Sequence, residues 1–494
     1  MKKILTLLLA SLAFTASAQN EFIAYPSTGK GVSSTFVTDY HCLGINPANL
    51  GWQAYDKKKV TMGSSEFGMS IYSEALAKQD LRDNIWGVIK SGSLDTLSYE
   101  EKVSAAQGFA SDFAFNWDYN MFGFSYQSEK FGGIAVSIRS RATWASSFDP
   151  AFSELLFQGK FASYFDSLNY FNGTDTVRIE NNGNMSYDSS QNVISGQASI
   201  PVPISELVGD TYLRLSLNRE YHIGYGRKLF GKDTSFALYA GVGAKYIQGI
   251  AMMNLTSDGD SYTMISSFSP GFDLDYGAVA SGNPSAVAGQ AQNFWRSPVG
   301  HGFGFDFGIN ARLFNKLHLA ASVTNIGSMT YTGNVYEGVD TLVVNYSSSG
   351  IEDMNIANSV PEMLEESGFF KLRGVEEVTI KLPGTLRFGA SLELGNIAHV
   401  GVDLVTPFDK ELPGSVNGFA WGIGGDVKLG GGKVFLMTGL TGGGGYDMQI
   451  PVGVNFVLGG GAYEVGIASR DAITFFTQNS PTVSAAFGFA RVRF

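Results

Sequence analysis

The chain has 494 residues, with 34 basic and 45 acidic side chains and a net charge of −11 at pH 7. This acidic balance argues against a nucleic-acid partner, which would require a basic patch. Cys42 is the only cysteine, so an intramolecular disulfide is excluded and the fold is not a disulfide-stapled secreted scaffold.

Residues 1–18 have the three-part layout of a secretory signal peptide. Lys2 and Lys3 precede an apolar run from Ile4 to Phe14, and Ala16-Ser17-Ala18 provides a cleavage site. The alternative, a membrane anchor, is disfavoured because the run is shorter than the roughly 20 residues of a spanning helix. Removing Lys2 and Lys3 from the 34 basic residues leaves 32 against 45 acidic ones. We therefore expect an exported protein that is still acidic after cleavage.

Residues 19–59 look irregular and contain a cluster of turn-forming residues. This cluster is Asn46, Pro47, Ala48, Asn49, Leu50 and Gly51. Strand patterns begin at Val60, and four long inserts interrupt them. The inserts are residues 73–112, 149–211, 256–295 and 347–381.

Helical signals occur within these inserts. The spacing of apolar residues predicts helices over 73–90 and 99–107, and Asp149 with Pro150 predicts a capped helix through Gln158. Ser359 and Glu362 form a capping-box pattern for a helix over 359–368. Residues 174–199 are polar and predict either a solvated loop or a weak hairpin.

The strand pattern is clearest from His301 to Leu313. Side chains of a strand point alternately to opposite faces, and here one face is apolar while the other carries glycine, carboxylate, amide and guanidinium groups. The apolar face consists of Phe303, Phe305, Phe307, Ile309, Ala311 and Leu313. The same alternation returns in later strands, whose polar rows we assign to an enclosed lumen. The polar residues assigned to the lumen are Asp306, Asn310, Arg312, Arg387, Glu393, His399, Asp403, Asp426 and Lys428.

About fourteen strands can be counted, many of roughly 9–12 residues, the length that a tilted strand needs to cross a bilayer. Closing them into a ring pairs every backbone group and removes the sheet edges. The sequence therefore predicts an all-β fold, a transmembrane antiparallel β-barrel over residues 60–494 with partly helical loops. A secreted two-sheet sandwich is the alternative.

The last strand ends on Phe494, and Ala490 and Val492 share its face by simple alternation. Such an ending resembles the cue that the outer-membrane barrel insertion machinery reads. In the same alternation Gly488 and Ala486 fall on the face of Phe494, while Phe487 and Phe489 fall on that of Arg491 and Arg493. An ordinary last strand is the alternative reading.

The element from Asn46 to Gly51 resembles the start of the long-chain fatty acid transporter (FadL-like) superfamily. That resemblance implies a fourteen-stranded barrel whose N-terminal segment folds into the lumen as a hatch. The Gly-Phe-Gly-Phe-Asp-Phe-Gly strand at 302–308 and Leu382-Pro383-Gly384 resemble a Bacteroidota branch of this superfamily. The branch includes barrels of unassigned function and PorV-like accessory barrels of the type IX secretion system.

Catalytic chemistry finds little support in the sequence. The five histidines are scattered without metal-ligand spacing, and no G-x-S-x-G element accompanies them. The glycine pairs at 241–243 and 302–304 lie within strands, without the following helix that a phosphate loop requires. Asp258-Gly259-Asp260 lacks the spaced ligands of a calcium hand. We therefore predict no enzyme activity, no metal site and no cofactor.

Two functions remain open for an outer-membrane barrel. The first is passive passage of a hydrophobic small molecule, with residues 46–51 in a movable hatch. The second is a non-transporting accessory or plug barrel that docks on an envelope machine such as the type IX secretion system. The expected partners are membrane lipid and the barrel insertion machinery, together with a hydrophobic ligand or a secretion-system component.

Overall fold

The structure is a computed structural model that describes residues 25–52, 58–73, 98–182, 190–288, 296–351, 363–365, 368–471 and 481–494. The signal peptide expected at residues 1–18 lies outside these ranges. So do residues 74–90 of the first predicted helix and most of the helix predicted at 359–368.

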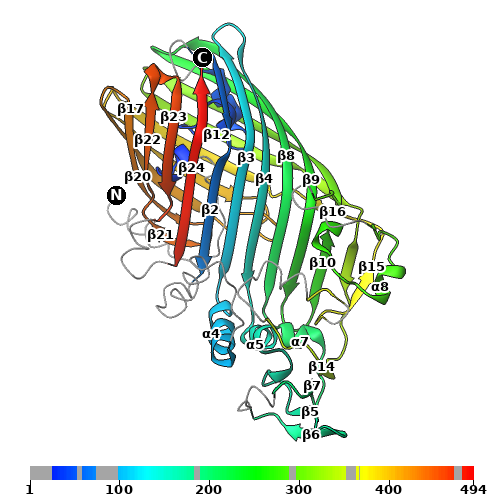
Figure 1. Ribbon diagram of the computed structural model, residues 1–494. Helices are drawn as coiled ribbons and strands as arrows, with labels where there is room; N and C mark the ends of the chain where they lie inside the picture. The colour runs from blue at the N-terminus through cyan, green and yellow to red at the C-terminus, as the bar shows by residue number, and fades with distance from the viewer. Residues whose placement is uncertain are drawn as a thin grey trace, which may run out of the picture.

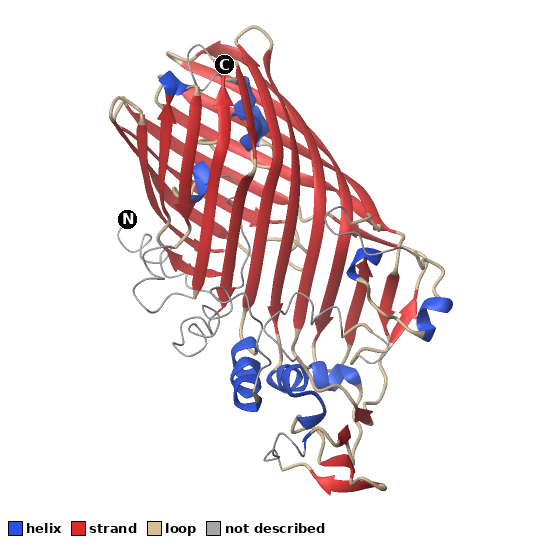
Figure 2. Ribbon diagram, in the orientation of Figure 1, coloured by secondary structure: helices blue, strands red, loops and turns tan. Residues whose placement is uncertain are grey.

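Fourteen antiparallel strands of the described residues form a closed barrel (Figures 1 and 2). Neighbours in the ring follow chain order, and β24 closes it by pairing with β1 and β2, which together form the first strand. The barrel strands are β1 (Val60–Ser64) with β2 (Glu66–Ser73), β3 (Phe113–Ser128), β4 (Gly132–Ser147), β8 (Tyr212–Lys232), β9 (Phe236–Ser257), β11 (Gly300–Leu313), β12 (Leu317–Tyr331), β17 (Thr385–Leu394), β18 (Ala398–Pro407), β19 (Ala420–Leu429), β20 (Val434–Gly443), β22 (Val452–Leu458), β23 (Tyr463–Ser469) and β24 (Thr482–Arg493). The predicted transmembrane barrel is confirmed.

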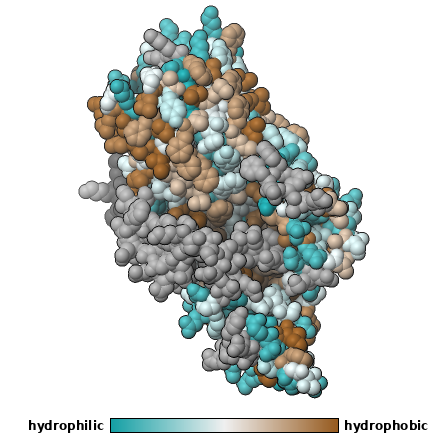
Figure 3. All heavy atoms as spheres, viewed as in Figure 1, coloured by the Kyte–Doolittle hydropathy of each residue, from teal (hydrophilic) through white to brown (hydrophobic). Residues whose placement is uncertain are grey.

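Each strand separates an apolar outer face from a polar inner face. In β11, Phe303 is 62% exposed on the outside, whereas Asp306 is 1% exposed on the inside. Exposed phenylalanine, leucine, isoleucine and valine side chains recur on the other strands, and Figure 3 shows apolar side chains gathered on the barrel wall. An apolar outer surface matches a hydrocarbon environment, in which closed barrels satisfy all backbone hydrogen bonds.

The two ends of the barrel differ in the length of their connections. Short turns such as 129–131 and 314–316 lie at the end that carries the C-terminus, called here the turn end (Figure 1). The opposite loop end carries the long inserts. There the sheet continues through β10 (Tyr262–Phe268), β13 (Val335–Gly338), β15 (Leu372–Gly374), β16 (Val378–Lys381) and β21 (Tyr446–Gln449). The inserts predicted at 256–295 and 347–381 thus contain strands of the main sheet.

The inserts also build a lobe beyond the barrel rim, called here the loop lobe (Figure 1). Its helices include α4 (Tyr99–Phe109), α5 (Pro150–Gln158), α7 (Ile204–Val208) and α8 (Ala278–Ser281). The caps predicted for α5 are confirmed, since the Asp149 carboxylate accepts from Ala151 N and Pro150 begins the helix. A four-stranded sheet joins β5 (Ser167–Phe171), β6 (Thr176–Glu180), β7 (Val193–Gln197) and β14 (Asn345–Tyr346). The polar stretch 174–199 is therefore partly strand, because it pairs with the apolar β5 rather than only with itself.

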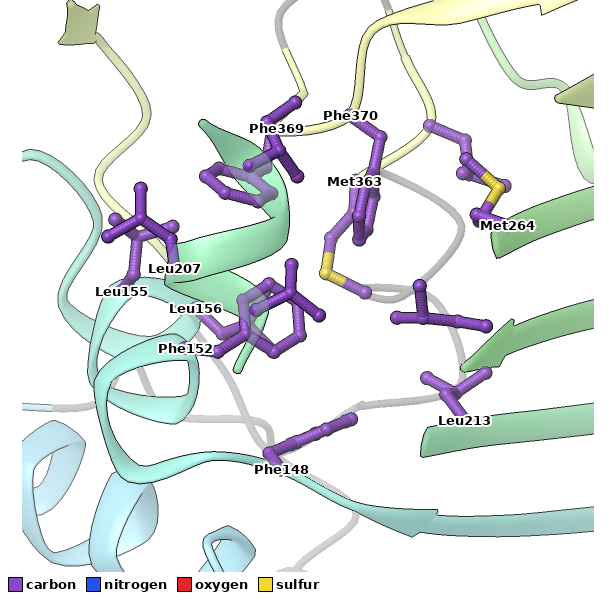
Figure 4. Close-up of a cluster of buried hydrophobic side chains, with 14 of the residues drawn as sticks. Phe148, Phe152, Leu155, Leu156, Leu207, Leu213, Met264, Met363, Phe369 and Phe370 are labelled. Atoms are coloured by element: carbon purple, nitrogen blue, oxygen red, sulfur yellow. The ribbon is translucent and has the colours of Figure 1, made fainter. Parts of the chain in front are cut away.

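An apolar core holds the loop lobe together (Figure 4). Phe152 and Leu155 of α5 pack with Leu207 of α7 and with Phe369 and Phe370 from the later insert. The same cluster includes Leu213 and Met264 of the barrel rim, so the lobe is continuous with the barrel. In the described residues no helix is both long and apolar enough to cross a membrane.

The barrel wall is irregular where the ring closes. Ser65, with a positive φ of 55°, interrupts the first strand between β1 and β2. Its neighbours are irregular at the same level, with a register shift between Asn120 and Phe122 in β3 and another between Glu464 and Gly466 in the β23–β24 pair. Regular backbone pairing is thus interrupted at the same level in three adjacent strands.

The irregularity in β24 overturns the simple alternation expected for the C-terminus. A β-bulge at Phe489–Ala490 places two consecutive residues outside, which reverses the faces on either side of it. Arg491 and Arg493 are buried at 3% and 2% exposure. Outward or partly exposed positions are Phe487, Phe489, Ala490, Val492 and Phe494, whereas Ala486 and Gly488 are buried inside. The expectation that Phe487 and Phe489 share a face with the two arginines is wrong for this reason.

Candidate functional site

The lumen is filled at the turn end by residues 25–52, called here the lumen segment. It contains the short helices α2 (Tyr25–Thr28), η1 (Asp39–Cys42) and η2 (Pro47–Gly51), and its side chains are nearly all buried. Figure 1 shows this dark blue segment surrounded by strands. Asn46 starts η2 by accepting a 3.1 Å hydrogen bond from Ala48 N, and Pro47 supplies a preset φ at the first helical position.

The asparagines of the predicted hatch motif contact the wall and the segment itself. Asn46 Nδ2 donates to the Ile309 carbonyl of β11 at 3.2 Å. Asn49 Nδ2 donates to the carbonyls of Ser34 at 2.9 Å and Val37 at 2.8 Å, and its Oδ1 accepts from Asn310 Nδ2 at 3.1 Å. Ala48 and Leu50 are fully buried. The motif thus folds the segment back on itself and joins it to β11.

Glycines on the inner face bring the wall close to this motif. A Cβ atom at Gly241 of β9 would overlap the Pro47 backbone, and one at Gly308 of β11 would overlap the Asn46 side chain. A Cβ at Gly133 of β4 would likewise overlap the Leu50 carbonyl oxygen. The glycine-rich inner faces therefore make room for the lumen segment rather than for an open channel.

Two of the predicted lumen carboxylates hold the first half of the segment. The Asp403 carboxylate of β18 accepts from Ser33 N at 2.6 Å and from Ser34 N at 2.8 Å. The Asp426 carboxylate of β19 pairs with Lys30 Nζ at 2.7 Å. Both acids are almost fully buried, so each contact is made without competing water.

A second anchor lies where the ring closes, and the sequence analysis missed it. Arg491 pairs with Asp39 of the lumen segment and with Glu464 of β23, the latter at 3.0 Å. Beside them, Glu66 of β2 accepts from Tyr40 Oη at 2.7 Å and contacts His41 Nε2 at 2.9 Å. The arginines of β24 were the available signal in the sequence for this anchor, but the bulge changes which face of the strand they occupy.

A third polar cluster lies on the predicted lumen row of β11. Asp306 contacts His222 Nε2 of β8 at 2.8 Å and accepts from Asn325 N at 2.8 Å. Lys245 Nζ of β9 lies 3.8 Å from the same carboxylate. All three ionisable side chains are buried, which ties β8, β9 and β11 together beneath the lumen segment's second half.

The remaining predicted lumen residues lie on β11, β17, β18 and β19. Arg312 Nη2 lies 3.6 Å from Glu393, which also contacts His318 Nε2 at 3.1 Å. His399 bonds Ser391 Oγ at 2.9 Å, and its ring lies 4.1 Å from that of Phe36. Lys428 is half-buried, while Arg387 is buried.

Above the lumen segment, toward the loop end, lies a small polar chamber of about 60 Å³. Its floor is Gly44, and the Pro413–Gly414 stretch of the β18–β19 loop forms its roof, where Arg214 donates to the Lys410 carbonyl at 3.0 Å. Polar wall residues include Asn116, Arg141, Thr143, Ser216, Asn218, Glu220, Thr385 and Arg387. The volume admits only a few water molecules. Within the described residues, the lumen segment therefore fills the turn end of the lumen, and the chamber above it is small.

Metal-ligand clusters are not found within the described ranges. No group of three histidine, cysteine, aspartate or glutamate side chains there is arranged to hold a metal ion. His41 and His222 pair with carboxylates that join strands or hold the lumen segment. His301 lies outside the barrel against Tyr246. These contacts are structural.

The fold is similar to several solved outer-membrane channels. The toluene transporter TodX of Pseudomonas putida shares 9% identity and a TM-score of 0.41, with 97% of this chain and 98% of that chain covered. A FadL homologue of Pseudomonas aeruginosa shares 10% identity and a TM-score of 0.39, with the same coverage. A TodX variant described as a monoaromatic hydrocarbon channel shares 10% identity and a TM-score of 0.43, over 95% of this chain and 97% of that chain.

A search of the curated proteins finds no match to this chain. Residues 154–415 match a family model, and this range covers more than half of the sequence. The matched range runs from α5 to the roof of the polar chamber. The chain belongs to the family described as "Family of unknown function (DUF5723)".

Proposed function

We propose that this chain is a passive outer-membrane transporter for hydrophobic small molecules, captured in a closed state, and that the lumen segment is its hatch. The observation that carries the proposal is how the passage is blocked. The block at the turn end is a single chain segment, joined to the described wall by side-chain contacts and able to move without breaking strand pairs. If the filling of the lumen served only to stabilise the barrel, side chains of the wall could fill it, and a separate chain segment would not be needed.

The cargo class follows from where apolar surface is available. The surface of the loop lobe carries exposed apolar side chains such as Ile200 and Leu342, and an apolar cargo gains about 25 cal/mol per Å² of apolar surface that it buries against them. The polar chamber offers less, because Arg141, Glu220 and several amides line it beside a few apolar residues such as Leu382. We infer that an apolar cargo leaves the lumen beside Ser65, where neighbouring strands of the wall are irregular, and enters lipid.

A disulfide lock tests the hatch. In a Cys42→Ala background, Asn46→Cys and Gly308→Cys would place two sulfurs at the closest approach of the lumen segment to β11. Oxidation should suppress uptake of an apolar fluorophore by outer-membrane vesicles, and reduction of the same sample should restore it. Equal uptake by the oxidised and reduced forms would reject the hatch.

An accessory barrel is a second candidate, favoured by the shape of the loop lobe. The lobe projects beyond the rim (Figure 1), and Ile200 and Leu342, which lie just after β7 and just before β14, are 82% and 61% exposed. Ile200→Ser with Leu342→Ser leaves the buried core untouched. Loss of a stoichiometric partner on purification of this variant from native membranes would support docking, whereas unchanged isolation with bound lipid would support transport.

A further inference from the structure

The turn end carries a ring of exposed cations, although the whole chain is acidic. They come from the start of β1 and from the β3–β4, β8–β9, β11–β12 and β19–β20 turns. These cations are Lys59, Lys130, Arg227, Lys232, Lys316 and Lys433. In the part of the chain that the structure describes, none of the six has a carboxylate within ion-pair distance. Their charge is therefore available to a partner.

The acidic side chains at this end are few and mostly engaged. Asp233 pairs with Lys228 at 2.8 Å, and Glu393 contacts Arg312 and His318. Glu129 in the β3–β4 turn is exposed beside Lys130. The turn end is therefore positive overall, and the acidity of the chain is concentrated in the loops at the other end.

Apolar side chains stand beside these cations at the tips of the same turns. Phe131 follows Lys130 and is 70% exposed, and Phe314 precedes Lys316 in its turn and is 68% exposed. Ile397 at the β17–β18 turn is 70% exposed. Aromatic and apolar tips next to long cationic side chains are the arrangement of a bilayer interface, where the ring enters the acyl boundary and the amine reaches phosphate.

We propose that the turn end of this barrel binds anionic phospholipid headgroups. The distribution of the cations favours a lipid leaflet over a protein partner, because they lie on five separate positions around the barrel rather than on one patch. A planar array of phosphates contacts all of these positions together. The apolar tips fix the depth at which the barrel sits, and the cations select lipids with net negative charge.

Spin-labelled lipids test the selection. The full-length protein is reconstituted in vesicles of phosphatidylcholine and phosphatidylglycerol, and the fraction of each labelled lipid held at the protein surface is measured by electron paramagnetic resonance. The wild type should prefer phosphatidylglycerol several-fold, since one lysine near an anionic surface contributes about a fivefold preference. The preference should fall at high salt.

The variant Lys130→Glu, Lys232→Glu, Lys316→Glu should lose this preference, and the matched variant with arginine at the same three positions should keep it. All three positions are exposed, so neither variant disturbs the barrel core. A wild type without preference, or a preference that survives the glutamate substitutions, would overturn the proposal and leave the basic ring to an acidic protein partner.

Discussion

The lumen segment fills one end of the barrel and the loop lobe projects from the other, and the two are held by different interactions. The lumen segment is held by buried ion pairs and hydrogen bonds such as Lys30–Asp426 and Ser33–Asp403. The loop lobe is held by apolar packing around Phe152. The difference follows from the strand period, because a wall whose outer face is apolar has only its alternate, polar positions left for the inside. Loop residues are not restricted to alternating apolar and polar positions, so the loop lobe can pack apolar side chains together.

The largest expected effect concerns the polar anchor. Arg491→Ala leaves Asp39 buried without its cation, and breaking such a pair costs about 3–5 kcal/mol. Thermal unfolding in detergent, followed by the heat-dependent shift in gel mobility, should show a markedly lower Tm. Arg227→Ala, at an exposed arginine of the turn end, serves as the control and should leave Tm unchanged.

The loop lobe should instead unfold locally, without unfolding of the barrel. Phe152→Ala removes a fully buried ring, a change that costs about 3–5 kcal/mol, yet the ring contacts loop residues rather than the closing strands. Proteolysis should cut residues 148–211 of the variant while the barrel keeps its Tm. Phe171→Ala, at an exposed position of the same lobe, should remain resistant. A fall in barrel Tm equal to that of Arg491→Ala would show that the two regions unfold as one.

A smaller effect is expected where the wall meets the hatch motif. Gly241→Ala adds a methyl group against Pro47, and overpacking of this kind costs about 1–3 kcal/mol. Because the segment can shift more easily than the strand, uptake of an apolar probe should rise while the wall stays intact. Gly282→Ala, whose added methyl group would lie 3.9 Å from the Val279 carbonyl oxygen and overlap nothing, should change neither property.

The smallest effect is at the start of α4, whose capping box joins Ser98 and Glu101. Ser98→Ala should weaken the helix by about 1 kcal/mol, measured by faster amide hydrogen exchange over residues 102–106, whereas Ser98→Thr should retain protection. Hydrogen bonds from the Ser98 backbone N–H and hydroxyl lower the pKa of Glu101. The lowered pKa means that this contribution is present above the ordinary value of 4.5 and is lost as pH falls through the folded-state pKa.

Much of the barrel could be predicted from the sequence because its two faces differ chemically. The alternation of Phe303, Phe305 and Phe307 with polar residues predicted the strand and its outward face. The helix at 150–158 followed from its cap at Asp149 and Pro150, which needs no tertiary information, whereas the Ser98 cap of the helix predicted over 99–107 was not used.

The contacts inside the lumen could not be predicted from the sequence, for physical reasons. Lys30 and Asp426, or Asp39 and Arg491, are brought together only by ring closure, and their spacing in the chain carries no period. The bulge at Phe489–Ala490 changes which residues face inward, although neither of these two residues is a glycine or a proline. The strands hidden in the polar stretch 174–199 depend on pairing with β5.

The contact between Asp39 and Arg491 joins residues 452 positions apart. The two side chains meet only when β24 pairs with β1 and β2 and closes the ring. The step that removes the two sheet edges therefore also brings the lumen segment to its anchor. Formation of the wall and placement of the segment are coupled through this ion pair.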